Sequence, residues 1–175
     1  MEKQNTVRTV NWRQKDDWLK PIVSLYQHVW SLDTDCTERF KRHMSYEGFR
    51  GSISLNEENK LIGFAYGYAS LSGQYYHELL AQHMRPDLTN EWLTNCFEFV
   101  ELCVHPSNRQ QGIGSLLHDH LLKDMQYETS VLTTQQSNLA ARKMYDKKGW
   151  NVIDDSFFPN EKTMKRYLIY GKKLS

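Results

Sequence analysis

The residues best suited to bind a charged ligand lie in the segment Arg109-Gln110-Gln111-Gly112-Ile113-Gly114, between a predicted strand and a predicted helix. Glycine has no Cβ, so the main chain at Gly112 and Gly114 can approach a ligand closely. A helix that starts here presents N–H groups without intrahelical partners and the positive end of its dipole. Such a turn can bind a pyrophosphate without a cationic side chain. The alternative is a tight strand-to-helix turn with no ligand, because short glycine patterns are weak evidence when taken alone.

Two other nucleotide-binding patterns do not fit this segment. A dinucleotide fingerprint needs a third glycine where Leu117 stands, and a P-loop needs Gly-Lys-Ser/Thr at its end.

A second spaced motif follows in Asn138-Leu-Ala-Ala141-Arg-Lys-Met-Tyr145-Asp-Lys-Lys-Gly149-Trp150. Asn138, Ala141, Tyr145 and Lys148 share one face of a predicted helix, and Gly149 is placed to end it. Each residue also has a structural interpretation. Asn138 could cap the helix, and Tyr145 could be a core aromatic residue.

The overall composition predicts one globular domain over residues 1–175. Lys and Arg number 22 and Asp and Glu 21, so a net charge of +1 predicts neither nucleic acid nor an acidic membrane as a partner. Three cysteines without CxxC spacing argue against a disulfide framework. Neither a signal peptide nor an apolar run of membrane-spanning length is found, so we expect a cytoplasmic protein.

The elements that would position both motifs alternate between strands and helices. Periodicity predicts strands at 6–12, 52–55, 61–69, 97–104, 129–134, 150–158 and 164–172. Helices are predicted at 18–30, 37–46, 113–126 and 138–148, with a short one at 77–84 that Pro86 ends. The rest of the stretch from Ser70 to Asn95 has no clear pattern. This order indicates an α/β protein with one mixed sheet.

Taken together, Val104-His105-Pro106, the Arg-x-x-Gly-x-Gly turn and the Asn138–Trp150 motif closely resemble the GNAT family of N-acetyltransferases. The resemblance covers about residues 97–150, and before that it extends only to the order of elements. It implies a mixed, mostly antiparallel sheet of six to seven strands flanked by about four helices. It also implies acetyl-CoA as the acyl donor and an amine as the acceptor, with no metal and no covalent enzyme intermediate.

The resemblance assigns roles to individual residues. Main-chain N–H groups of Leu102, Cys103 and Val104 would bind the pantetheine arm and polarise the thioester carbonyl. The pyrophosphate would be bound by the turn, which comprises Arg109, Gln110, Gln111, Gly112, Ile113 and Gly114. Asn138 would contact the pantetheine arm. Tyr145 would lie near the thioester sulfur and protonate the departing thiolate, because a tyrosine is protonated at neutral pH.

Only the neutral amine can attack, so a general base must also accept a proton from the ammonium form of the acceptor. Glu98 lies eleven residues before Arg109, where some family members carry this base, and it is our preferred candidate. Glu101 lies on the opposite face of a regular strand, but a β-bulge would reverse the parity and favour it instead. A water chain is a third alternative. Cys103 is expected to be an inert core residue rather than a nucleophile. His118 and His120 face different ways on a helix, which argues against a metal pair.

The acceptor is not determined by the sequence. The first two helices and residues 70–95 would select it, and they combine aromatic residues with acids, which suits a cationic amine. A polyamine, an amino sugar, an amino acid and a protein lysine all remain open. Thr133 stands where some N-terminal-amine acetyltransferases carry glutamate, which weakens the case for a ribosomal-protein substrate. A homodimer stays open, as does a second function class, a non-catalytic acyl-CoA sensor or interaction domain.

Overall fold

The computed structural model describes residues 7–174, which form seven strands, six α-helices and one short 3-10 helix at Pro106–Asn108. The strands are β1 (Arg8–Trp12), β2 (Arg50–Leu55), β3 (Leu61–Ala69), β4 (Cys96–Val104), β5 (Thr129–Gln135), β6 (Asn151–Phe157) and β7 (Tyr167–Lys173). The helices are α1 (Leu19–Trp30), α2 (Thr37–Met44), α3 (Tyr75–His83), α4 (Pro86–Leu93), α5 (Ile113–Leu122) and α6 (Leu139–Lys147). The mixed, mostly antiparallel sheet has the order β1-β2-β3-β4-β5-β7-β6.

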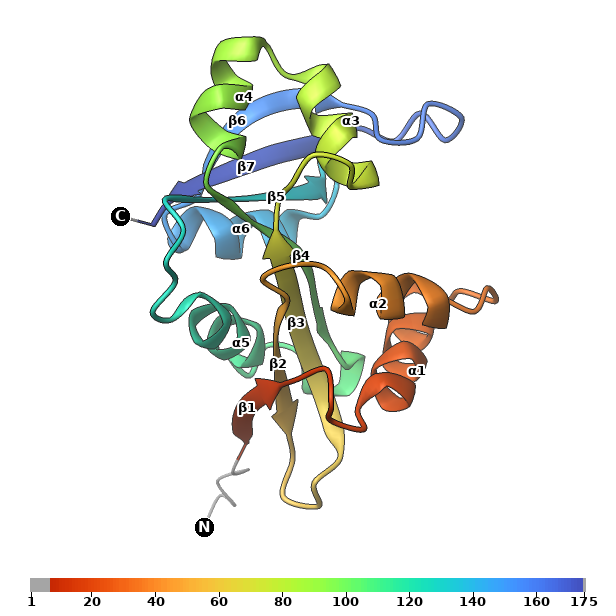
Figure 1. Ribbon diagram of the computed structural model, residues 1–175. Coiled ribbons are helices and arrows are strands. Elements are labelled where there is room, and N and C mark those ends of the chain that lie inside the picture. Colours follow the sequence, from red (N-terminus) through yellow and green to blue (C-terminus); the bar gives the residue numbers. More distant parts are fainter. Residues whose placement is uncertain (1–6, 175) are drawn as a thin grey trace. The chain divides into compact units, whose positions relative to one another are not determined.

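The chain forms two compact units, and β4 contributes residues to both. The first unit contains the described residues up to Tyr68 together with Val100–Asp124. In it, β1 pairs with β2 and β2 with β3, both antiparallel. Helices α1 and α2 cover one face of these strands and α5 covers the other (Figure 1). Strand alternation explains the two faces, because Ile53 belongs to the core under α1 and α2 while Ser52 Oγ lies 2.7 Å from Nδ1 of His120 in α5.

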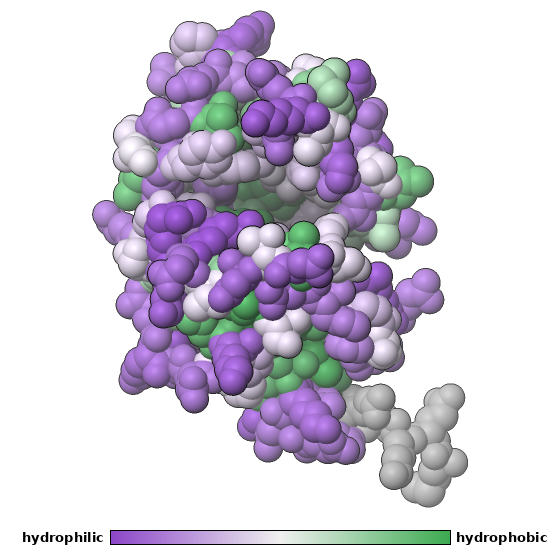
Figure 2. Space-filling model, turned by 90° about the vertical axis from the view of Figure 1, so that its right-hand side faces the viewer, coloured by the Kyte–Doolittle hydropathy of each residue, from purple (hydrophilic) through white to green (hydrophobic). Residues whose placement is uncertain are grey.

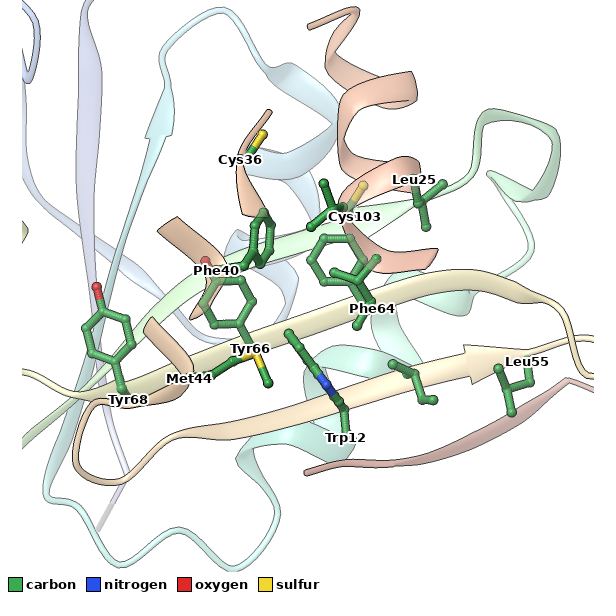
Figure 3. Close-up of a cluster of buried hydrophobic side chains, with 13 residues drawn as sticks. Trp12, Leu25, Cys36, Phe40, Met44, Leu55, Phe64, Tyr66, Tyr68 and Cys103 are labelled. Carbon is green, nitrogen blue, oxygen red and sulfur yellow. The ribbon is translucent and has the colours of Figure 1, made fainter. Parts of the chain in front are cut away.

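The core of the first unit is rich in aromatic side chains. In Figure 3, Phe40 from α2 and Phe64 and Tyr66 from β3 gather beside Trp12 at the end of β1. The Trp12 ring needs Gly51 opposite it in the β1–β2 register, since an added Cβ there would lie 2.6 Å from Trp12 Cε3.

The second unit contains Ala69–Phe99 and the described residues from Met125 on. Here β4 pairs with β5 in parallel, and β7 pairs with both β5 and β6 antiparallel. Ile169 of β7 joins the core formed with α3 and α4, whereas the next residue, Tyr170, points its hydroxyl to Asp146 of α6 at 3.3 Å. Two helical layers therefore cover opposite faces of these strands.

Most predicted elements are present, with some corrections. The stretch from Ser70 to Asn95 holds two helices, because Pro86 begins α4 at its first turn instead of only ending a helix at 77–84. Proline suits this position since the first N–H groups of a helix have no partner. The helix predicted at 113–126 ends at Leu122. Of the first predicted strand, Thr6 lies outside the described residues.

Hydrophilic side chains dominate the surface seen in Figure 2, with hydrophobic side chains scattered among them. Among residues 7–174, no helix combines the length and apolar character needed to cross a lipid bilayer.

Candidate active site

The glycine-rich turn has the conformation of an anion-binding loop. Gly112 caps the start of α5 with φ of 77°, and Gln110 has a left-handed φ of 62°. An added Cβ at Gly112 would meet no atom within 4 Å, so the main chain there borders open space. Within the part of the chain described, no acceptor binds the main-chain N–H groups from Gln110 to Gly114. These donors are free to bind an anion.

The preceding residues hold the turn in place. The main-chain N–H of His105 donates to the carbonyl of Ile62 at 2.8 Å, which ties the end of β4 to β3. The His105 Nδ1 then accepts from the N–H of Ser107 at 3.1 Å, which makes His105 part of the turn. On the other side, α5 is anchored in the core by Ile113 and Leu117, which are 2% and 0% exposed. The turn is thus fixed at both ends while its N–H groups stay open.

The predicted thioester-binding residues lie in the same unit as this turn. Leu102 and Val104 are half-buried, and Cys103 is a core residue. Burial raises the pKa of the Cys103 thiol well above its usual range, and Glu101 adds to the effect. The thiolate is therefore disfavoured, which agrees with an inert Cys103.

Glu101 lies at the start of this segment, in a partly buried polar cluster. Burial raises the pKa of Glu101 to about 7, against the opposing effects of Arg39 and of a hydrogen bond from the main-chain N–H of Leu102. Two phenols, Tyr26 of α1 and Tyr66 of β3, lie within its electrostatic reach. A carboxyl group with a pKa near neutrality can accept a proton at physiological pH.

The alternation of β4 is interrupted near Glu101. Val100 packs against the core under α1 and α2, and Cys103 belongs to the same core. Residues three apart in a regular strand point to opposite faces, so the parity changes between them. Glu101 faces this core as well, since Tyr26, Arg39 and Tyr66 affect its pKa or are affected by it. This is the irregularity that would favour Glu101 over Glu98.

Glu98 lies in the second unit and is more deeply buried. It is 4% exposed, and its Oε2 atom is buried without a hydrogen-bond partner among the described residues. Burial raises the pKa of Glu98 to about 8. Its neighbours include Tyr76 of α3, whose hydroxyl lies 2.7 Å from Thr133 Oγ1. At neutral pH this carboxyl group is mainly protonated, which makes it a weaker base at rest.

The Asn138–Trp150 motif forms α6 in the second unit. Asn138 caps the helix, since its Oδ1 accepts from the N–H of Ala141 at 3.2 Å. That contact leaves the amide NH₂ group as its donor for a ligand. The ring of Tyr145 packs 6.3 Å from Phe99 and 5.9 Å from Trp150, centroid to centroid. Tyr145 is 7% exposed, so packing fixes its ring.

The structure thus places the predicted residues in two groups. The first unit contains the turn, Glu101 and Leu102–Val104, and the second contains Glu98, Asn138 and Tyr145. Sequence reasoning missed the cluster of Tyr26, Arg39 and Tyr66. Tyr26 falls within the helix predicted at 18–30 without any sign of this role, and no local pattern marks Arg39. Trp92 is one of the aromatic residues of the 70–95 stretch that we expected to select the acceptor, but it packs over Gly171 in the second unit's core.

The described residues contain no group of three or more His, Cys, Asp or Glu side chains arranged to bind a metal ion. His118 is 3% exposed and contacts Asp119, whereas His120 contacts Ser52, so the two histidines do face different ways.

The acetyltransferase (GNAT) family model matches residues 17–150, which is most of the chain. This chain therefore belongs to the GNAT family and is an acyltransferase of the acetyl-transferring class. The match starts well before the two motifs and includes α1 and α2.

Solved structures of the same fold agree with this assignment. The ribosomal-protein-S18-alanine N-acetyltransferase of Escherichia coli is 15% identical with a TM-score of 0.71, over 97% of this chain and 95% of that one. Arabidopsis thaliana NAA60, solved in complex with acetyl-CoA, is 13% identical with a TM-score of 0.69, over 96% and 98%. A GNAT-family acetyltransferase of Bacillus cereus ATCC 10987 is 16% identical with a TM-score of 0.67, over 96% and 97%. No protein of curated function matches the sequence.

Proposed function

We propose that this protein transfers the acetyl group of acetyl-CoA to a primary amine, by direct attack of the amine on the thioester. The observation that supports this most is the set of N–H groups from Gln110 to Gly114, which have no acceptor among the described residues and surround the open space at Gly112. Several main-chain donors and a helix N-terminus directed at one point suit a pyrophosphate group. The residues present therefore fit coenzyme A.

The thioester would be bound by Leu102–Val104. The parallel ladder between β4 and β5 covers only Cys96 to Glu98, and Leu102–Val104 lie past its end. The main-chain N–H of Leu102 already has the Glu101 carboxyl group as a partner. Other main-chain groups beyond the ladder need one, and the pantetheine amides can supply it. An N–H donor to the thioester carbonyl would stabilise the charge that develops on its oxygen, typically by ~10²–10³ in rate.

Two side chains would transfer the protons. Glu101 would take one from the acceptor ammonium group, since its carboxyl group has a pKa of about 7. Tyr145 would donate one to the departing thiolate of CoA, and Asn138 would contact the pantetheine arm through its amide NH₂. Glu98, the preferred base from the sequence, is the second candidate, because its buried Oε2 atom has no partner among the described residues.

Binding of acetyl-CoA by the turn is tested with a matched pair of glycine variants. Gly112 and Gly73 both have left-handed φ angles, 77° and 93°, and an added Cβ meets no atom within 4 Å at either. Gly112→Ala and Gly73→Ala should therefore carry a similar backbone strain of roughly 1–2 kcal/mol. Only Gly112→Ala should weaken acetyl-CoA binding in calorimetry, by tenfold or more, and Gly112→Asp should abolish it. Equal acetyl-CoA affinities in the two alanine variants would contradict the proposed cradle.

Catalysis is tested separately, by thiol release from acetyl-CoA with a panel of amines. Release that depends on an amine and is lost in Tyr145→Phe supports the enzyme. Saturable acetyl-CoA binding with no thiol release for any amine would instead identify an acyl-CoA sensor or interaction domain.

A further inference from the structure

The cluster around Glu101 contains a cation that has no ionic partner among residues 7–174. The guanidinium carbon of Arg39 lies 5.0 Å from the ring centroid of Tyr26 and 5.5 Å from that of Phe40. The guanidinium hydrogen-bonds to the Tyr26 side chain, whereas the Arg39 Nε atom is buried and donates no hydrogen bond among the described residues. Within the same part of the chain, no carboxylate lies close enough to Arg39 to form an ion pair, Glu101 included.

Aromatic rings fix the position of this cation. Phe40 packs 5.3 Å from Tyr26 and 5.5 Å from Tyr66, centroid to centroid, so α1, α2 and β3 meet at one place. Figure 3 shows Phe40 and Tyr66 side by side in this region. The Tyr66 hydroxyl lies 2.7 Å from His43 Nδ1, and burial lowers the pKa of His43 to about 4, so this imidazole is neutral. Arg39 is thus the cation of the cluster and Glu101 its acid.

Two opposite charges therefore lie within electrostatic reach of each other without contact. A partly buried guanidinium with an unused donor is costly unless an anion pairs with it. The charged form of Glu101 is also poorly compensated, because burial raises its pKa more than Arg39 lowers it. A ligand with one negative and one positive group would complete both interactions. An arginine fork also matches a carboxylate in shape.

We propose that Tyr26, Arg39, Tyr66 and Glu101 form the acceptor site, and that it selects a small amine carrying a carboxylate near the amino group, as in a free amino acid. The carboxylate pairs with Arg39 and the ammonium group faces Glu101. A polyamine fits poorly, because its second cation would lie beside Arg39. This inference rests on the proposed acetyl transfer and specifies its acceptor.

Calorimetry on the CoA-saturated protein tests the proposal without requiring turnover. The probes are free L-leucine and 3-methylbutylamine, which is the same molecule without its carboxylate, and the same pair is made for phenylalanine, alanine and glutamate. We expect at least one amino acid to bind tenfold or more tightly than its decarboxylated partner. Equal binding of the two members of every pair, or no binding of any amino acid, would overturn the proposal.

Variants on α2 assign the preference to Arg39. Arg39→Met should remove most of the affinity for the amino acid and leave the affinity for the decarboxylated amine unchanged. Arg39→Lys, which keeps the positive charge, should retain part of the affinity for the amino acid. Arg42→Met is the matched control, because it removes the same charge from an exposed position of α2. If Arg42→Met lowered the affinity as much as Arg39→Met, general charge would explain the effect and the site would be wrong.

The two proposals fail in different ways. If simple amines caused thiol release but amino acids bound no more tightly than their decarboxylated partners, acetyl transfer would stand and the proposed class of acceptor would be wrong. Arg39-dependent binding of amino acids without any thiol release would support the acceptor site and contradict catalysis.

Discussion

Replacing Glu101 by glutamine removes a carboxyl group whose pKa is about 7, while keeping its size. If Glu101 is the general base, only its ionised form is active, so activity should be lost as the pH falls through 7. The acceptor amine titrates too, with a reference pKa of ~10.4 when it resembles lysine. Its ionisation affects wild type and variant alike, so it cancels in the ratio of their kcat/KM values.

The size of the effect follows from this pKa. A group with a pKa of about 7 is ionised to about a tenth at pH 6 and to about nine-tenths at pH 8. The ratio of wild type to Glu101→Gln should therefore rise about tenfold over this range and then level off. A positioned base typically contributes ~10²–10⁴ in rate, which sets the height of the plateau.

The assay is continuous thiol release from acetyl-CoA, measured from pH 5.5 to 9 at constant ionic strength. Glu98→Gln is the control, because the carboxyl group of Glu98 has a pKa of about 8 and lies in the other unit. A ratio for Glu101→Gln that stays flat with pH refutes the role of Glu101. A rise centred near 8 in the Glu98→Gln ratio would assign the base to Glu98.

Three further predictions concern single residues. Burial raises the pKa of Glu98 from 4.5 to about 8, so its contribution to stability is present in full below pH 4.5 and is lost as the pH rises to 8. Glu98→Gln should therefore gain stability relative to wild type between pH 5 and 8, by up to a few kcal/mol in urea unfolding. If the difference in unfolding free energy between variant and wild type did not change with pH, the carboxyl group would not be buried as described. Tyr145→Phe keeps the ring packing against Phe99 and Trp150, so kcat should fall by ~10² with little change in Tm or acetyl-CoA affinity; an unchanged kcat would exclude Tyr145 as the proton donor. Gly51→Ala places a Cβ 2.6 Å from Trp12 Cε3 and should destabilise the protein by about 1–3 kcal/mol, which a urea midpoint equal to that of wild type would contradict.

Local patterns in the sequence predicted the elements and motifs that depend on neighbouring residues. The turn from Arg109 to Gly114 needed only glycine between a strand and a helix, because the left-handed start of α5 is a local property. Asn138 as a cap follows from a short-range rule as well. The stretch from Ser70 to Asn95 was predicted poorly, because proline can end one helix or begin the next and only the structure shows that Pro86 begins α4.

The tertiary structure alone decided how Glu101 is surrounded. Arg39 lies on α2, Tyr26 on α1 and Tyr66 on β3, so each comes from a different element and no spacing in the chain relates them. The break in the alternation of β4 near Glu101 likewise became visible only from the core that Val100 and Cys103 share. The sequence by itself indicated an anion-binding turn and a carboxyl group at Glu101 as a candidate base. Burial and electrostatic fields depend on groups distant in sequence. They raise the pKa of Glu101 to about 7 and bring Arg39 within its electrostatic reach, with no ion pair between them in the described part of the chain.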